Sequence, residues 1–293
     1  METMERREIV GDSMWQGAWR RLKRNRMAMG GLIFLIIIAF CAVAAPWVSP
    51  HDPYKTDFRF ALEGPSRDHL LGRDNLGRDV LSRIIYGSRI SISIGLISVA
   101  IGLAIGVPVG AFSGYYGGKF DLFIQRLVDI MMAFPGILLA LIIVSVLGVG
   151  LTNAMIALGV VSIPQYIRLV RGSVLSLREE DFVQAARALG ARDFIIIFRH
   201  ILPNCLAPVI VQSTLQIATA ILWAAGLGFL GLGAQAPLPE WGTMLSRGRT
   251  YLRVAHHVTT FPGLAIMLTV LGFNLLGDGL RDALDPRMKK IGV

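Results

Sequence analysis

Six apolar runs, each long enough to cross a bilayer, constrain this chain of 293 residues more than any other feature. A membrane-spanning helix needs about 20 predominantly apolar residues. Hydrophobic residues make up 54% of the sequence, and a soluble domain of this length does not have such a composition. The sequence therefore predicts an all-α, polytopic membrane protein with six transmembrane helices. The runs lie at approximately 28–49, 90–113, 129–149, 153–172, 205–233 and 258–278.

The distribution of lysine and arginine predicts how these helices are oriented. With a cytosolic amino terminus, the cytosolic segments hold nineteen of the 29 basic residues, and seven of the other ten lie in the long outer loop 50–89. Long loops count for little in the positive-inside rule. Both termini and the loop 174–204 are therefore predicted to be cytosolic. The net charge of +9 reflects these membrane flanks, so nucleic-acid binding is not expected.

The segment 1–27 is predicted to contain a basic amphipathic helix on the inner leaflet, because apolar residues recur in it at three and four residues among arginines and lysines. The first run contains Ala42-Val-Ala44, as a cleaved signal peptide would, but it is too long for the apolar region of such a peptide. We expect it to remain as a span. Cys41 and Cys205 are expected to be small core residues rather than a disulfide. The apolar residues that recur in the predicted amphipathic helix of segment 1–27 are Trp15, Ala18, Trp19 and Leu22.

The loop between the fourth and fifth runs contains the most informative local pattern. Small and apolar side chains recur there at helical intervals and predict a short helix with one apolar face. Gly190 is predicted to end this helix with a positive φ, and a second helix is expected to run from about Phe194 to Pro203. Periodicity alone leaves two interpretations open, a docking helix for a partner or an amphipathic helix lying on the membrane. The recurring residues are Phe182, Ala185, Ala186 and Leu189.

On the outer side, residues 73–89 are predicted to form a separate helix before the second span. Its apolar side includes Val80 and Ile84, and it also carries Arg78 and Arg83. Such a helix either braces the next span or forms a lid or docking surface.

Several classes of function lack the residues that they need. Ionisable side chains are almost absent from the runs, which argues against an ion-driven carrier, and no catalytic set lies at membrane depth. His256 and His257 lack a further ligand at suitable spacing, so no metal site is predicted. Lys119 is followed by Phe120, and the phosphate-binding loop of ATPases is missing. A transport function would need energy from another polypeptide.

Glycines recur every fourth residue in the second run, and such a ridge lets helices approach closely. Pro108 and Pro164 can bend their helices. Close packing with bends suits a bundle that moves between two packings, and it equally suits a static one. The ridge consists of Gly102, Gly106, Gly110 and Gly114.

Motifs along the whole chain resemble those of one family. The loop gives Gln184-Ala185-Ala186, then Gly190, then Leu202-Pro203, in the register of the Glu-Ala-Ala motif of bacterial ABC importers. Further stretches are Gly72–Arg83, Phe229–Gly233, Pro239–Gly242, Phe261–Gly263 and Asn274–Arg287. Together they resemble the second, C-type membrane subunit of the dipeptide/oligopeptide/nickel permease family. The departure is Gln184, where the family usually has Glu.

The resemblance implies a type I importer permease fold with a domain at 28–280, a cytosolic coupling loop at 174–204 and a tail at 281–293. It implies that Gln184, Ala185, Ala186, Gly190, Leu202 and Pro203 dock an ATPase, with Ala186 facing the partner's groove. The implied partners are a paired homologous permease, two ATP-binding subunits, an extracytoplasmic solute-binding protein and membrane lipid. ATP and Mg²⁺ would be bound by the ATPase subunits, so this chain is itself neither catalytic nor cofactor-binding.

The substrate follows least directly from the sequence. Short peptides are the expected substrate, and nickel or another small solute transported by the same family is the alternative. A non-transporting membrane scaffold or channel component is the alternative from a different class of function. Channels usually show polar or charged pore rings, which these runs lack. Four polar residues of the fifth run either line the translocation path or hydrogen-bond to neighbouring helices. They are Gln212, Ser213, Thr214 and Gln216.

Overall fold

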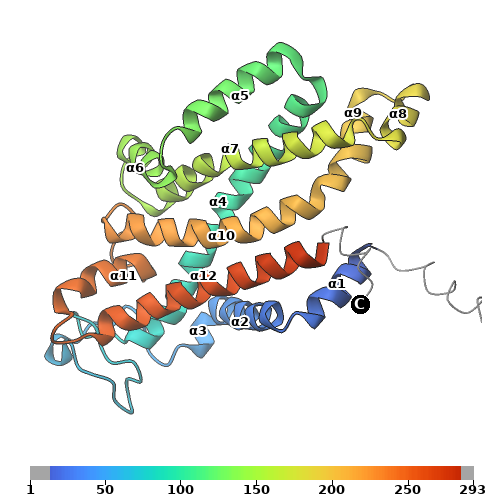
Figure 1. The fold of residues 1–293 in the computed structure, drawn as a ribbon. Coiled ribbons are helices and arrows are strands. Elements are labelled where there is room, and N and C mark those ends of the chain that lie inside the picture. The colour runs from blue at the N-terminus through green and yellow to red at the C-terminus, as the bar shows by residue number, and fades with distance from the viewer. Residues whose placement is uncertain (1–13, 285–293) are drawn as a thin grey trace, which may run out of the picture.

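The computed structural model describes residues 14–284, and these residues are mostly helical (Figure 1). An isolated antiparallel bridge joins Arg73 to Asp79, and the described residues contain no β-strand. Five helical segments are long and apolar enough to span a membrane, and a bent pair of helices is a sixth candidate in this part of the chain. The all-α architecture with six spans is therefore confirmed.

The spans are joined by short helices and by one long irregular segment between residues 49 and 79. The spans are α2 (Arg26–Val43), α4 (Val80–Tyr116), the pair α5 (Gly118–Met132) and α6 (Gly136–Leu147), α7 (Leu151–Leu177), a segment ending in α10 (Leu206–Phe229), and α12 (His257–Leu284). The shorter helices are α1 (Met14–Arg24), α3 (Ala45–Val48), η2 (Phe58–Phe60), α8 (Asp181–Ala188), α9 (Asp193–Ile195), η3 (Ile196–Ile201), η4 (Leu202–Cys205), α11 (Trp241–Gly248) and η5 (Arg249–Tyr251).

The third span differs from the single run predicted at about 129–149. The chain turns at Gly117 and Gly118, which have φ values of 63° and 61°, and α5 starts there. The axes of α5 and α6 then meet at 91°. Pro135 is the N-cap of α6, and a proline disfavours helical φ and ψ at the residue before it. The third apolar segment is therefore a bent pair of helices, and it begins eleven residues earlier than predicted.

The glycine ridge of α4 packs directly against α7, and this pair makes the most extensive contact among the described helices. A Cβ atom added to Gly106 would lie 2.5 Å from the Cβ of Tyr166 and 2.9 Å from the carbonyl oxygen of Ile163. At Gly110 it would lie 2.7 Å from the carbonyl oxygen of Ile167. Such separations exclude any side chain, so the predicted close approach of helices at the ridge is confirmed.

The outer helix predicted over 73–89 does not exist as a separate element. Residues 73–79 form turns, and α4 starts at Val80 and continues into the span without a break. Asp79 caps α4 by accepting a hydrogen bond from the Ser82 backbone N–H at 2.7 Å. Arg83 is 2% exposed and donates to the carbonyl oxygen of Pro53 at 2.9 Å. The apolar periodicity of residues 73–89 thus comes from the buried first turns of α4, and the prediction of a separate surface helix is wrong.

Pro203 does not end the second helix of the 174–204 loop, contrary to expectation. The segment Asp193–Phe229 runs as one span through α9, η3, η4 and α10. The turn of η3, immediately before Pro203, is π-helical, and η4 is a 3₁₀ turn with the proline at its start. These irregular turns accommodate the missing N–H and the ring of the proline, so the helical path continues.

The amphipathic helix predicted in residues 1–27 is α1, although residues 1–13 lie outside the described part. Ala18 and Leu22 of α1 are buried, and the Arg21 Nε donates to the carbonyl oxygen of Ala283 at 2.8 Å. This side of α1 therefore packs on the end of α12 rather than only on lipid. The tail beyond residue 284 also lies outside the described residues.

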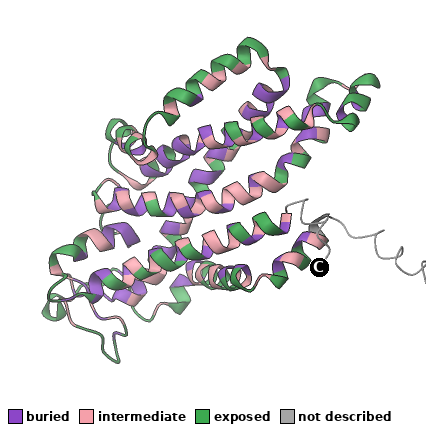
Figure 2. Cartoon of the chain, in the orientation of Figure 1, coloured by how far each residue is buried: buried purple, intermediate pink, exposed green. Residues whose placement is uncertain are grey.

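Broad apolar surfaces remain exposed on several helices, as Figure 2 shows for α5. On α5, Phe120 and Phe123 are 47% and 62% exposed, and on α2 Phe40 is 63% exposed. Contiguous apolar faces of this kind are expected where a helix meets lipid or another subunit.

Candidate functional site

The helix α8 lies at the same end of the bundle as α1 and the end of α12 (Figure 1). Its last turn closes with two hydrogen bonds, from the Ala191 N–H to the Ala186 carbonyl at 3.1 Å and from the Gly190 N–H to the Arg187 carbonyl at 3.0 Å. Gly190 has φ 78°. This is the Schellman pattern of helix termination. The prediction that Gly190 ends the helix with a positive φ is confirmed.

The two sides of α8 have different environments. Val183 and Ala186 are 0% and 9% exposed, whereas Phe182 and Leu189 are 42% and 88% exposed, and Ala185 is also exposed. The inward pair packs in a cluster formed by the ends of α4, α7, α8, η3 and α10. Its further members are Ala111, Tyr115, Val170, Val174, Ile196, Ile197, Ile201, Cys205 and Val209.

The expectation that Ala186 faces a partner's groove is wrong. Adjacent residues of a helix point about 100° apart, so Ala185 and Ala186 lie at opposite edges of the predicted apolar stripe, and only Ala186 is turned inward. Val183 lies one turn before Ala186 on the buried side, and its packing fixes which alanine turns inward. The surface offered to a partner therefore consists of Phe182, Ala185 and Leu189, which we call the outer face of α8.

Polar contacts fasten α8 and α9 to the end of α4. The Tyr115 hydroxyl donates to Asp193 Oδ1 at 2.7 Å, and Arg187 donates to the Tyr115 oxygen at 3.4 Å. The hydrogen bond to Tyr115 raises the pKa of Arg187, so this guanidinium stays charged. At the end of α7, Arg178 Nη1 donates to the carbonyl oxygen of Gly114 at 3.1 Å. The loop is therefore held against α4 and α7 at several points.

Gln184, the departure from the usual Glu, has a specific contact. Its Nε2 donates to the backbone carbonyl of Arg178 at 2.9 Å. An ionised glutamate is an acceptor only and could not make this bond. The amide therefore joins α8 to the C-terminal end of α7 in a way that a carboxylate cannot.

Leu202 and Pro203 lie in η4, next to the cluster beneath α8. They line an apolar hollow of about 270 Å³ together with Val107, Phe198, Cys205, Leu206 and Val209. Pro203 is exposed, and Leu202 is half-buried. The structure thus places these two residues beside the same helix ends that support α8, but not on its outer face.

The four polar residues of α10 mostly bond within the chain. Gln212 Nε2 donates to Gln165 Oε1 at 3.3 Å, and Ser213 accepts from the Tyr166 hydroxyl at 3.1 Å. Thr214 donates to the carbonyl oxygen of Ile210 at 3.0 Å. Gln216 is 4% exposed, and Thr214 lies on the opposite side of the helix from it. Gln212 and Ser213 therefore bond to α7, whereas the Thr214 bond lies within α10. A role of these residues in a translocation path stays a prediction.

Sequence reasoning missed Tyr115 and Asp193 as parts of this site. They lie 78 residues apart, and neither belongs to the motif in the loop. A tyrosine at the end of an apolar span gives no signal of its own, because such residues are common at membrane interfaces.

The backbone of Gly190 gives a first testable prediction. Replacing Gly190 by valine should strain the turn by about 1–2 kcal/mol, because a β-branched residue disfavours a left-handed φ. No atom lies within 4 Å of the added Cβ, so the strain comes from the backbone alone. We expect solute uptake to fall while the subunit still reaches the membrane. Gly190→Asn, which tolerates this φ, should retain most activity; normal uptake by the valine variant would show that this turn is not needed for coupling.

Two family models match the sequence. The model of the binding-protein-dependent transport system inner membrane component matches residues 106–290. The model of the N-terminal transmembrane domain of oligopeptide transport permease C matches residues 13–65. Together they include all six spans except the first part of α4.

Relatives are similar over nearly the whole chain. A dipeptide transport system permease protein DppC of Alkalihalophilus pseudofirmus is 52% identical over 94% of this chain and 91% of its own length. A di/tripeptide transport system permease protein DppC of Pseudomonas aeruginosa is 50% identical over 96% and 95%. A glutathione transport system permease protein GsiD of Escherichia coli is 49% identical over 94% and 91%.

The fold is also similar to a solved membrane subunit. A chain of the inward-facing MetNI methionine ABC transporter superposes with a TM-score of 0.56 and 22% identity, covering 69% of this chain and 96% of that chain. This likeness shows the type I importer permease fold.

Proposed function

This chain belongs to the family of binding-protein-dependent transport system inner membrane components, and from that membership we propose that it is the C-type subunit of an ATP-driven importer of short peptides. The observation that supports a peptide substrate is the similarity, over nearly the full length, to permeases named for dipeptides, di/tripeptides and glutathione. All three are short peptides, so the shared substrate class extends beyond one relative.

A separate ATPase is the proposed energy source. The outer face of α8 presents an almost fully exposed leucine and a half-exposed phenylalanine at the surface, although α8 packs firmly on its other side. An exposed apolar anchor on a rigid support is typical of an interface hot spot. We propose that Leu189 and Phe182 insert into a groove on the ATPase, with Gln184, Gly190 and the Leu202-Pro203 turn holding the loop in position.

The contacts behind α8 suggest how movement would be transmitted. Val183 and Ala186 share one buried cluster with residues of α4, α7 and α10. Because packed interiors are only slightly compressible, a displacement of α8 moves the ends of these helices with it. Tyr115 and Arg187 add polar links to α4. We propose that closure of the ATPases tilts these spans and alternates access to a central cavity.

The proposed assembly contains this chain, a paired homologous permease, two ATP-binding subunits and an extracytoplasmic solute-binding protein. ATP and Mg²⁺ belong to the ATPase subunits in this proposal. We propose that the exposed apolar faces of α2 and α5 contact lipid and the second permease. The proposed location is the inner membrane, with both termini and α8 cytosolic, which agrees with the common end shared by α1, α8 and the end of α12.

The experiment is ATP hydrolysis by the reconstituted complex. This chain is co-expressed with its neighbouring permease and ATPase genes, placed in liposomes, and assayed with the cognate binding protein, free or loaded with a dipeptide. Stimulation by the loaded binding protein is the expected result. Hydrolysis without stimulation by any short peptide would overturn the peptide assignment and point to nickel or another small solute. Failure of an ATPase to co-purify would overturn the transport proposal in favour of a scaffold.

A further inference from the structure

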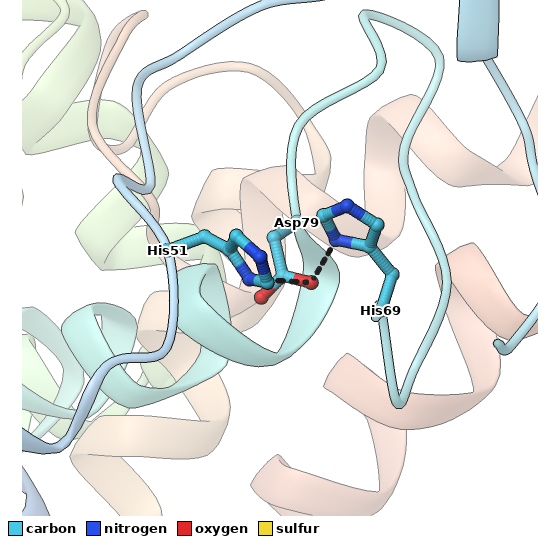
Figure 3. A group of neighbouring side chains, drawn as sticks. All are labelled: His51, His69 and Asp79. Atoms are coloured by element: carbon cyan, nitrogen blue, oxygen red, sulfur yellow. Dashed lines mark hydrogen bonds and ion pairs between the residues drawn. The ribbon is translucent and has the colours of Figure 1, made fainter. Parts of the chain in front are cut away.

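Three potential metal ligands meet at the end of the molecule opposite to α8. All three come from the irregular segment between residues 49 and 79: His51 follows α3, His69 lies in its second half, and Asp79 is the N-cap of α4. Figure 3 shows both imidazole rings directed toward the carboxylate of Asp79. Sequence reasoning missed this group, because the residues are far apart in a segment without periodicity.

The distances within the group are close to those of a coordination sphere. His69 Nδ1 lies 2.8 Å from Asp79 Oδ1, and His51 Nδ1 lies 3.8 Å from the same oxygen. One ligand atom from each residue lies within 4.8 Å of the other two. Ligands about 2.0–2.1 Å from a tetrahedral zinc ion lie roughly 3.3 Å from one another. To complete the geometry, the His69–Asp79 pair would have to separate by about 0.5 Å and the farthest pair to approach by up to about 1.5 Å, chiefly through the half-exposed His51.

The side chains around the group hold it in place. The second carboxylate oxygen, Asp79 Oδ2, accepts hydrogen bonds from the Ser82 backbone N–H at 2.7 Å and from its hydroxyl at 2.6 Å. The same Ser82 oxygen accepts a hydrogen bond from the backbone N–H of His51 at 3.0 Å. Ser82 thus fixes both the carboxylate and the backbone of a histidine, while Asp79 Oδ1 stays directed at the rings. Outer contacts of this kind orient the ligands in metal sites.

The group is closed on one side and open on the other. The side chains of His69 and Asp79 are 10% and 1% exposed, whereas that of His51 is 39% exposed. A mainly polar hollow of about 400 Å³, lined by residues that include His51, Asp52 and Tyr54, lies beside it. The hollow reaches the group at His51, so this is the side on which the group is accessible.

We propose that His51, His69 and Asp79 bind one divalent transition-metal ion, with Zn²⁺ the best match for two imidazoles and one carboxylate. The pair His69 and Asp79 could form only a hydrogen bond, and such a bond would not need His51. The ring centroids of His51 and His69 nevertheless lie 4.3 Å apart, so the second imidazole belongs to the group. The bound ion would cross-link the segment after α3 to the start of α4. This proposal does not depend on the transported solute.

Zinc binding by the purified complex tests the proposal. The wild-type complex and complexes carrying His51→Gln, Asp79→Asn or the control His256→Gln are dialysed against Zn²⁺, and bound zinc is measured by mass spectrometry. His256 is exposed and lies outside the group. We expect one more zinc ion per chain in the wild type and in the control than in the other two. Losing a ligand should weaken the affinity by about a hundredfold or more, because outer-shell changes alone cost ~10–100-fold.

Two outcomes would overturn the proposal. One is equal zinc content in the wild type and His51→Gln, since His51 is exposed and its replacement leaves the helix cap intact. The other is a zinc X-ray absorption spectrum of the wild type that shows fewer imidazole ligands than the two expected. Because the spectrum is measured on the unaltered protein, it decides the question even where Asp79→Asn fails to fold.

Discussion

Replacing Leu189 with aspartate is expected to abolish coupled transport and to leave the subunit folded. Leu189 is 88% exposed, so a charge there costs the isolated chain little. In the proposed interface the same charge would be buried without a partner. An apolar anchor at the centre of an interface contributes about 2 kcal/mol or more, so the ATPase should bind at least about thirtyfold more weakly. Co-purification of the ATPase measures the loss of binding, and ATP-dependent uptake measures the loss of coupled transport.

Leu189→Met is the matched control, because it keeps an apolar side chain of similar size. It should retain both association and uptake. Normal recovery of the ATPase with the aspartate variant would show that the outer face of α8 is not the docking surface. A subunit that no longer reaches the membrane would instead reveal a role of Leu189 in folding, contrary to its exposure.

Replacing Gly106 with alanine is expected to destabilise the bundle strongly. The added methyl group would overlap the Cβ of Tyr166 and the backbone of α7, and neither can move without shifting a helix. Overpacking of this kind costs about 1–3 kcal/mol, and more where the backbone has to shift. For a chain of this size we expect a melting temperature lower by roughly 2–4 °C for each kcal/mol. Thermal unfolding in detergent measures it.

Gly172→Ala in the partner helix α7 is the control for this experiment. It is exposed and no atom lies within 4 Å of an added Cβ. Alanine favours a helix by about 1 kcal/mol over glycine, so this variant should be as stable as the wild type or more so. If Gly106→Ala melts at the same temperature as Gly172→Ala, α4 and α7 do not depend on the close approach seen here.

The local sequence determined the features that depend on short-range physical chemistry. Apolar runs of sufficient length predicted the spans, since a bilayer requires them, and Gly190 was correctly placed at the end of α8 because few other residues adopt a positive φ. The four glycines of α4 were also correctly read as a surface for close packing. In each case the residue type alone decides the outcome: an apolar run favours the bilayer, and glycine permits a positive φ or a close approach of helices.

Only the tertiary structure decided features that depend on neighbours distant in the sequence. Which of Ala185 and Ala186 turns inward was set by the packing of α8 on α4 and α7, not by the apolar character that the two share. The proline at 203 does not end its helix, because π and 3₁₀ turns absorb it. His51, His69 and Asp79 meet because the chain folds back over the start of α4. Hydrophobic periodicity shows which residues share a side of a helix. It does not show which distant part of the chain packs against that side, and the three features above depend on that packing.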